Sequence, residues 1–71
     1  MIIFSERLKS ERKSKGYSQR KMAALLGITQ GTYTHYELIG KETGREPPLE
    51  MIKKIADILD VSIDYLFGRE D

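Results

Sequence analysis

The sequence contains no cysteine, which excludes disulfide bonds, thiolate zinc sites and cysteine nucleophiles at once. This absence suits a reducing cytoplasm, where we expect the protein to work. Long hydrophobic runs are also missing: the longest nearly unbroken one, residues 22–28, is far shorter than the ~20 residues of a membrane-spanning helix. Residues 1–4 lack the basic segment and long apolar stretch of a signal peptide. We therefore expect neither a membrane span nor a signal peptide.

Residues with catalytic potential are scarce. His35 is the only histidine, and no candidate nucleophile lies near it in the sequence. No phosphate-binding loop or dinucleotide-binding motif is present. The spacing of Asp57, Asp60 and Asp64 would suit a hard cation, but they lie on both sides of a predicted helix break, and a solvated acidic surface explains them better. We expect no enzyme, no cofactor and no metal site.

Charge is unevenly distributed along the chain. Residues 1–36 contain seven Lys and Arg against two acidic residues, a net charge of +5, whereas residues 37–71 contain five against nine, a net charge of −4. Such asymmetry is typical of a protein that meets a polyanion with a basic face. Solvated helix faces with scattered charges would give the same count, so both interpretations stay open on charge alone.

Signals for α-helices dominate, and strand alternation is nearly absent. The clearest apolar face recurs with the helical period and consists of Leu49, Ile52, Ile55, Ala56 and Leu59. The predicted N-caps are Ser5, Ser18, Thr29 and Ser62, and Pro48 suits the first turn of a further helix. The predicted helices cover residues 5–15, 18–26, 29–37, 48–59 and 62–67. The sequence thus predicts an all-α fold, a compact bundle of about five short helices in one domain, residues 1–71.

Residues 18–37 have the pattern helix, tight glycine turn, helix. Gly27 can adopt a positive φ at the turn, and Ala23 is small where the two helix backbones must approach. Once the apolar residues are turned inward, the outer face of the third helix holds Gln30, Gly31, Thr32, Thr34 and His35. These side chains are short, none is acidic, and most can form hydrogen bonds. A helix that lies in the major groove of DNA needs this composition.

The first turn of the second helix carries Arg20 and Lys21, where the helix dipole disfavours cations by a few tenths of a kcal/mol each. An anion bound there would reverse this effect, because free N–H groups, the dipole and both cations would converge on it. A phosphate is the natural candidate. The alternative is that both side chains simply extend into water.

Over residues 4–68 the chain resembles the phage-repressor and Cro-like helix-turn-helix proteins of bacteria, often called the Xre family. The motifs that carry the resemblance are Phe4, Leu8 and Arg12, then residues 16–19, Ala23, and residues 26–30, 36–37, 47–50 and 55–68. Their order and spacing make the combination highly specific. The resemblance implies the lambda-repressor-like DNA-binding fold, with the helix-turn-helix at residues 18–37.

The resemblance also implies roles for single residues. Gln19 would bond to a DNA phosphate and brace Gln30, which would read a base edge. Arg12 and Glu37 would form a structural ion pair between the first and third helices. With the two cations of the second helix and one from the loop, the predicted DNA-binding residues are Gln19, Arg20, Lys21, Gln30, Gly31, Thr32, Thr34, His35 and Lys41.

Several residues depart from the family pattern. Glu11 replaces an aliphatic residue, so the first helix would pack loosely or Glu11 would pair with a basic side chain. Tyr33 replaces Ile or Val and adds bulk between the helices, and an acidic pair is replaced by Arg20 and Lys21. The loop over residues 38–46 is longer than usual, which leaves open whether Lys41 or Arg45 supplies its phosphate contact. Gly31 costs about 0.5–1 kcal/mol relative to Ala and is either a point of close backbone approach or a tolerated first-turn glycine.

The sequence therefore predicts a DNA-binding transcriptional regulator, a repressor of phage, prophage or plasmid type that acts at a promoter operator. The alternative is a protein-interaction module, such as the antitoxin of a toxin–antitoxin pair. The expected partner is double-stranded DNA, bound in the major groove at an inverted repeat by a homodimer. The candidate dimer-interface residues are the apolar Met51, Ile58, Tyr65 and Phe67, with residues 1–3.

Overall fold

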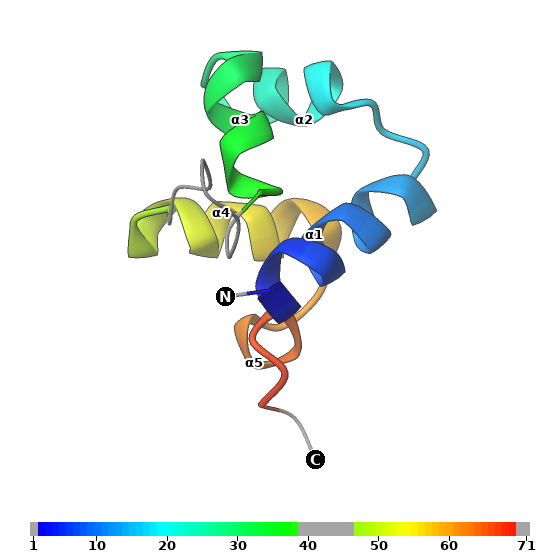
Figure 1. The fold of residues 1–71 in the computed structure, drawn as a ribbon, viewed down its shortest axis with the longest axis vertical. Helices are drawn as coiled ribbons and strands as arrows, with labels where there is room; N and C mark the ends of the chain where they lie inside the picture. The colour runs from blue at the N-terminus through cyan, green and yellow to red at the C-terminus, as the bar shows by residue number, and fades with distance from the viewer. Residues whose placement is uncertain (1, 39–46, 70–71) are drawn as a thin grey trace.

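A computed structural model of the chain describes residues 2–38 and 47–69. Its described part holds five helices and no strand: α1 (Ile2–Ser14), α2 (Gln19–Leu26), α3 (Gln30–Tyr36), α4 (Leu49–Leu59) and α5 (Ile63–Leu66). In Figure 1, α2 and α3 lie together at one end, α1 and α4 cross the middle, and α5 lies at the opposite end. The predicted all-α fold is confirmed. None of the described helices is long and apolar enough to cross a membrane.

Three of the predicted N-caps are formed as expected. Ser18 Oγ accepts a hydrogen bond from the Lys21 N–H at 2.9 Å, and Ser62 Oγ accepts one from the Tyr65 N–H at 2.9 Å. Thr29 Oγ1 accepts from the Thr32 N–H at 3.2 Å. Each cap satisfies a backbone donor that the first turn of a helix leaves without an intrahelical partner. The starts of α2, α3 and α5 are thus set locally by the sequence.

The prediction that Ser5 caps the first helix is wrong. The helix α1 begins at Ile2, and Ser5 is a buried residue inside it. The physical reason is Phe4, which is fully buried and stacks on Phe67 with the ring centroids 5.0 Å apart. This long-range contact fixes the chain ahead of Ser5 in the helix and overrides its local preference for a cap. At the other predicted start, Pro48 is the N-cap of α4, just before its first helical residue.

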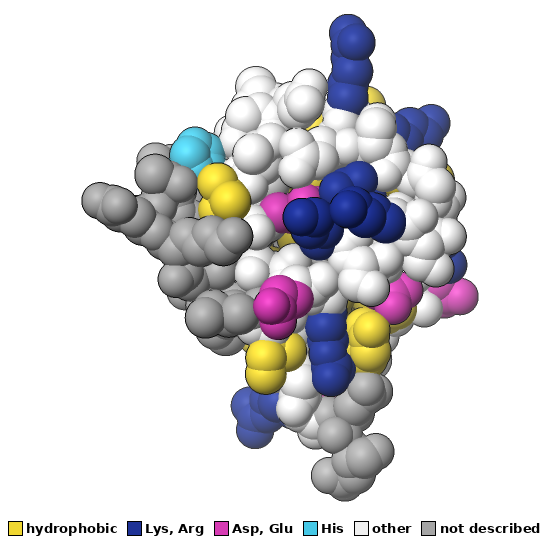
Figure 2. Space-filling view, turned by 45° about the vertical axis from the view of Figure 1, so that its right-hand side comes forward, with side chains coloured by type: hydrophobic (Ala, Val, Ile, Leu, Met, Phe, Trp, Pro, Cys, Tyr) yellow, Lys and Arg dark blue, Asp and Glu magenta, His cyan; other side chains and the backbone are white. Residues whose placement is uncertain are grey.

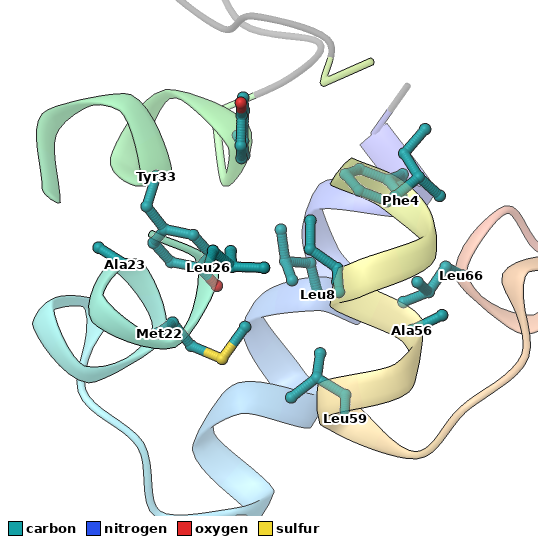
Figure 3. Packing of buried hydrophobic residues seen from close by; sticks show 12 residues of the cluster. Phe4, Leu8, Met22, Ala23, Leu26, Tyr33, Ala56, Leu59 and Leu66 are labelled. Carbon is teal, nitrogen blue, oxygen red and sulfur yellow. The ribbon is translucent and has the colours of Figure 1, made fainter. Parts of the chain in front are cut away.

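The core is one cluster to which all five helices contribute (Figure 3). Tyr33 points from α3 into the cluster beside Leu26 of α2, and its side chain is fully buried. The buried hydrophobic residues are Phe4, Leu8, Met22, Ala23, Leu26, Tyr33, Tyr36, Ile52, Ile55, Ala56, Leu59 and Leu66. Because α3 contributes two large tyrosines to this cluster, packing holds its inner face and leaves the opposite face outside.

Glu11 is held by a contact between α1 and α5. Its Oε2 accepts a hydrogen bond from the Tyr65 hydroxyl at 3.0 Å. Arg7 lies over the Tyr65 ring, with its guanidinium carbon 4.5 Å from the ring centroid, and donates to the Tyr65 carbonyl. We expected the first helix to pack loosely or Glu11 to pair with a basic side chain. This expectation is corrected, because the partner of Glu11 is a tyrosine hydroxyl.

The candidate dimer-interface residues within the described ranges have contacts inside this chain. Met51, Ile58, Tyr65 and Phe67 are partly buried and pack against the core. Ile3, which is one of the candidate residues 1–3, is exposed, and so are Leu25 and Leu49. Four of the candidate residues thus contribute to the fold, Ile3 stays exposed, and the dimer itself remains a prediction.

Candidate nucleic-acid interface

The turn between α2 and α3 places the two helices against each other at one end of the molecule (Figure 1). Gly27 ends α2 with φ +72°, and the Ile28 N–H bonds to the Ala23 carbonyl at 3.0 Å. An added Cβ at Gly27 would meet no atom within 4 Å, so the backbone conformation alone favours glycine here. The chain then turns directly into the Thr29 cap of α3. The predicted helix-turn-helix is therefore formed within the described residues.

The structure brings most of the predicted DNA-binding residues to this end. Gln30 and Gly31 are exposed in the first turn of α3, while Thr32, Thr34 and His35 are partly buried further along it. On α2, Arg20 and Lys21 are exposed in the first turn and Gln19 is partly buried. Lys41 and Arg45 lie outside the described residues.

The predicted ion pair between α1 and the end of α3 is present and buried. Arg12 Nε donates to Glu37 Oε2 at 2.7 Å, and Arg12 Nη2 donates to Glu37 Oε1 at 3.3 Å. The side chains are only 8% and 3% exposed, respectively. Arg12 Nη1 also donates to the Tyr17 carbonyl at 2.7 Å, so the guanidinium links α1, the segment before α2, and α3. Planar two-point contacts of this kind fix orientation as well as distance.

The Glu37 carboxylate has two further donors. The Tyr33 hydroxyl donates to Oε2, and Gln19 Nε2 donates to Oε1 at 3.1 Å. Burial by itself raises the pKa of Glu37, but the hydrogen bonds from Arg12, Tyr33 and Gln19 outweigh it and hold the pKa below its usual value. Burial and the bond to this carboxylate raise the pKa of Tyr33, which stays protonated as a donor. Glu37 is thus ionised and accepts hydrogen bonds only.

Gln19 connects this buried group to the outer part of α3. Besides its bond to Glu37, its Oε1 accepts a hydrogen bond from Thr34 Oγ1 at 3.0 Å. The resemblance implied that Gln19 would brace Gln30. In the free protein its partners among the described residues are Glu37 and Thr34 instead.

The hydrogen bond from the Tyr33 hydroxyl to Glu37 was not predicted from the sequence. In the sequence, Tyr33 was interpreted only as a bulky replacement for Ile or Val. The signal that could have found its role is its position four residues before Glu37, which places the two side chains on the same face of a helix.

The surroundings of this end are polar and carry cations. In the view of Figure 2, Lys and Arg side chains form a group at the centre of the face, and others lie at the top and in the lower part. Acidic side chains lie beside the central group and below it. The first turns of α2 and α3 contain no acidic residue. Across the part of the chain that the structure describes, no group of His, Asp or Glu is arranged to hold a metal ion. The arrangement is suited to an anionic, hydrogen-bonding surface such as DNA.

Gly31 has space around it and no special backbone conformation. An added Cβ there would meet no atom within 4 Å, and its φ is not in the positive range. Neither crowding nor strain within this chain requires a glycine at this exposed position of α3.

Residues 8–66 match the helix-turn-helix family. A similar protein is the SPbeta prophage-derived uncharacterized HTH-type transcriptional regulator YonR of Bacillus subtilis, 53% identical over 64 residues, which cover 90% of this chain and 56% of that protein. The uncharacterized HTH-type transcriptional regulator YqaE of the same organism is 48% identical over 68 residues, covering 96% of this chain and 55% of that protein.

A relative from another organism is the cryptic phage CTXphi transcriptional repressor RstR of Vibrio cholerae, 42% identical over 65 residues, which cover 90% of this chain and 54% of that protein. The chain therefore spans a little over half the length of these relatives. No solved structure matches it.

Proposed function

The chain belongs to the helix-turn-helix family, and we propose that it is a sequence-specific DNA-binding regulator of transcription, a repressor of phage, prophage or plasmid type. It would work in the bacterial cytoplasm, on a promoter operator. The observation that carries the proposal is the outer face of α3, which is polar and free of acidic residues and whose opposite face is packed into the core. The names of the relatives as phage and prophage regulators support the repressor type.

In the proposed complex, α3 enters the major groove and α2 crosses the DNA backbone. Gln30 reads a base edge, with Gly31, Thr32 and His35 beside it at bases or nearby phosphates. The phosphates are held by Arg20, Lys21 and Gln19 of α2, and by one loop cation, Lys41 or Arg45. The exposed first turns of both helices support this division, because exposed cations attract phosphate, while an amide that faces the groove can form two hydrogen bonds to adenine.

We further propose that the chain binds as a homodimer. A single α3 of seven residues presents little surface for reading bases, and two copies related by a two-fold axis would double it. The operator would then be an inverted repeat whose half-site centres lie about one helical turn, ~34 Å, apart.

In-vitro selection of bound duplexes from a random pool tests the function. We expect an enriched inverted repeat with that spacing, and protection of the repeat by the purified chain. Recovery of an asymmetric single half-site would reject the dimer and keep the regulator. The absence of any enriched motif would reject sequence-specific binding and favour the protein-interaction alternative.

A further inference from the structure

We propose that Thr34 is a positioning residue for DNA binding: its hydroxyl fixes the Gln19 amide so that one N–H of this amide is kept for a backbone phosphate. The proposal rests on the proposed function, since it assigns a role within the DNA interface. It also changes the role of Thr34, which the family resemblance placed among the residues that contact bases or phosphates directly.

The direction of each hydrogen bond follows from the chemistry of Glu37. An ionised carboxylate only accepts, and it has room for about four donors. Arg12 supplies two of them, the Tyr33 hydroxyl a third, and Gln19 the fourth at 3.1 Å. The end of the Gln19 amide that faces Glu37 must therefore be the NH2 group, because a carbonyl there would oppose another acceptor. The buried ion pair thus sets the orientation of the amide.

The same reasoning fixes the Thr34 proton. With the NH2 group on Glu37, the Gln19 carbonyl faces Thr34, whose Oγ1 is 3.0 Å away. A carbonyl only accepts, so the Thr34 hydroxyl donates its single hydrogen to Gln19. A phosphate oxygen also only accepts, and Thr34 in this arrangement has no proton to give it.

Gln19, in contrast, keeps a donor. Its NH2 group carries two hydrogens, and Glu37 uses one of them. Gln19 is partly exposed in the first turn of α2, next to the exposed Arg20 and Lys21. With its carbonyl held by Thr34 and one N–H held by Glu37, the amide cannot rotate without breaking both bonds. The second N–H is thereby prepared for an acceptor on the DNA backbone.

A double-mutant cycle tests the proposal. Binding of Thr34→Val, Gln19→Ala and the double variant is measured by fluorescence anisotropy at one salt concentration, on the selected operator and on a scrambled duplex. We expect Thr34→Val to weaken binding to both duplexes by about fivefold, as for the loss of one hydrogen bond. In the Gln19→Ala background the same substitution should have no further effect. Thr34→Ser, which keeps the hydroxyl, should bind like the unchanged chain.

Three results would overturn the proposal: no loss from Thr34→Val, a loss that persists in the Gln19→Ala background, or a loss confined to the operator and absent on the scrambled duplex. Thermal unfolding of every variant controls for folding, and Thr34→Ala gives the same comparison if Thr34→Val is poorly folded. Failure of the proposed function is a separate result, because it requires the unchanged chain to bind both duplexes equally. The cycle can then still be measured on either duplex.

Discussion

Two polar regions of this small protein lie within a few residues of each other and differ in where their hydrogen bonds go. The inner region consists of Arg12, Gln19, Tyr33 and Glu37, and its groups bond to one another. The outer region consists of Gln30, Gly31, Arg20 and Lys21, which are exposed to solvent. Within the described ranges no buried side-chain nitrogen or oxygen lacks a hydrogen-bond partner.

The difference shows how such a small domain holds α3 in place. The apolar core is limited, because a chain of this size buries only about 60% of its unfolded surface. The inner region adds directional bonds between α1, α2 and α3 that packing alone does not provide. In the proposed complex, DNA supplies the hydrogen-bond partners of the polar groups in the outer region. Substitutions in the inner region should therefore mainly change the free energy of unfolding. Those in the outer region should mainly change the affinity for DNA.

The largest effect is expected for Glu37→Ala. This substitution leaves the Arg12 guanidinium buried without its carboxylate, and we expect it to lower the free energy of unfolding by about 3–5 kcal/mol. Urea unfolding followed by circular dichroism measures the change. Glu6→Ala, at an exposed site in α1 beyond its first turn, is the matched control and should stay within about 0.5 kcal/mol of the unchanged chain. A loss below about 1 kcal/mol for Glu37→Ala would mean that the pair contributes no more than a surface ion pair.

The same carboxylate predicts a pH dependence of stability. The pKa of Glu37 is lower in the folded chain than the value of about 4.3 for an unfolded glutamate. Its contribution is therefore complete above the unfolded pKa and is lost as the pH falls through the folded pKa. Urea unfolding between pH 7 and acid should show a smaller loss for Glu37→Gln than for the unchanged chain. Parallel curves would contradict this prediction.

The sequence predicted the features of the fold that depend on local chemistry. Ser18, Thr29 and Ser62 cap helices as expected, and Gly27 has a positive φ. The start of α1 was not predictable in this way, because it depends on Phe4 packing on Phe67 at the other end of the chain. Asp60 ends α4 with φ 56°, a left-handed conformation that aspartate can adopt but that its neighbours in the sequence did not indicate.

The site was predicted in the same partial way. The family resemblance supplied the Arg12–Glu37 pair, and the structure contains it. The partners of Gln19 and the hydroxyl bond of Tyr33 could not be derived from the sequence, because they depend on the crossing of α1, α2 and α3 in space. Which outer residues touch DNA stays a prediction.

The outer region should divide into a residue that reads bases and residues that hold phosphates. Gln30→Ala should weaken binding to the selected operator by about 1–3 kcal/mol and relax the preference at one base pair. The chain contains no asparagine, so a glutamine must supply any two-point amide contact to adenine. The salt dependence of binding by Gln30→Ala should stay nearly unchanged, since no charge is removed.

Arg20→Ala is the matched comparison for Gln30→Ala. It should weaken binding to all duplexes alike and reduce the slope of log affinity against log salt by about one unit, because one phosphate contact is lost. Salt titrations on the operator and on a scrambled duplex distinguish the two variants. Equal weakening of both duplexes by Gln30→Ala would show that α3 is not the reading helix.

The smallest expected effect is at Gly31, where the substitution Gly31→Ala should stabilise the fold. The added Cβ meets no atom within 4 Å and the backbone is helical, so we expect a gain of about 0.5–1 kcal/mol. Gly16→Ala is the matched control: its Cβ also meets nothing within 4 Å, but φ is +77°. That substitution should destabilise the fold by about 1–2 kcal/mol through backbone strain alone.

Comparison of Gly31→Ala with Gly16→Ala tests why position 31 lacks a side chain. Gly31 lowers folding stability, and neither crowding nor backbone strain requires a glycine there. A close approach of α3 to another surface would explain its presence. We therefore expect Gly31→Ala to weaken DNA binding while raising the temperature of thermal unfolding. Gly16→Ala should lower that temperature and leave the affinity of the folded protein unchanged. If Gly31→Ala stabilises the fold and binds the operator as tightly as before, Gly31 is a tolerated first-turn glycine, and the side chains around it do all the reading.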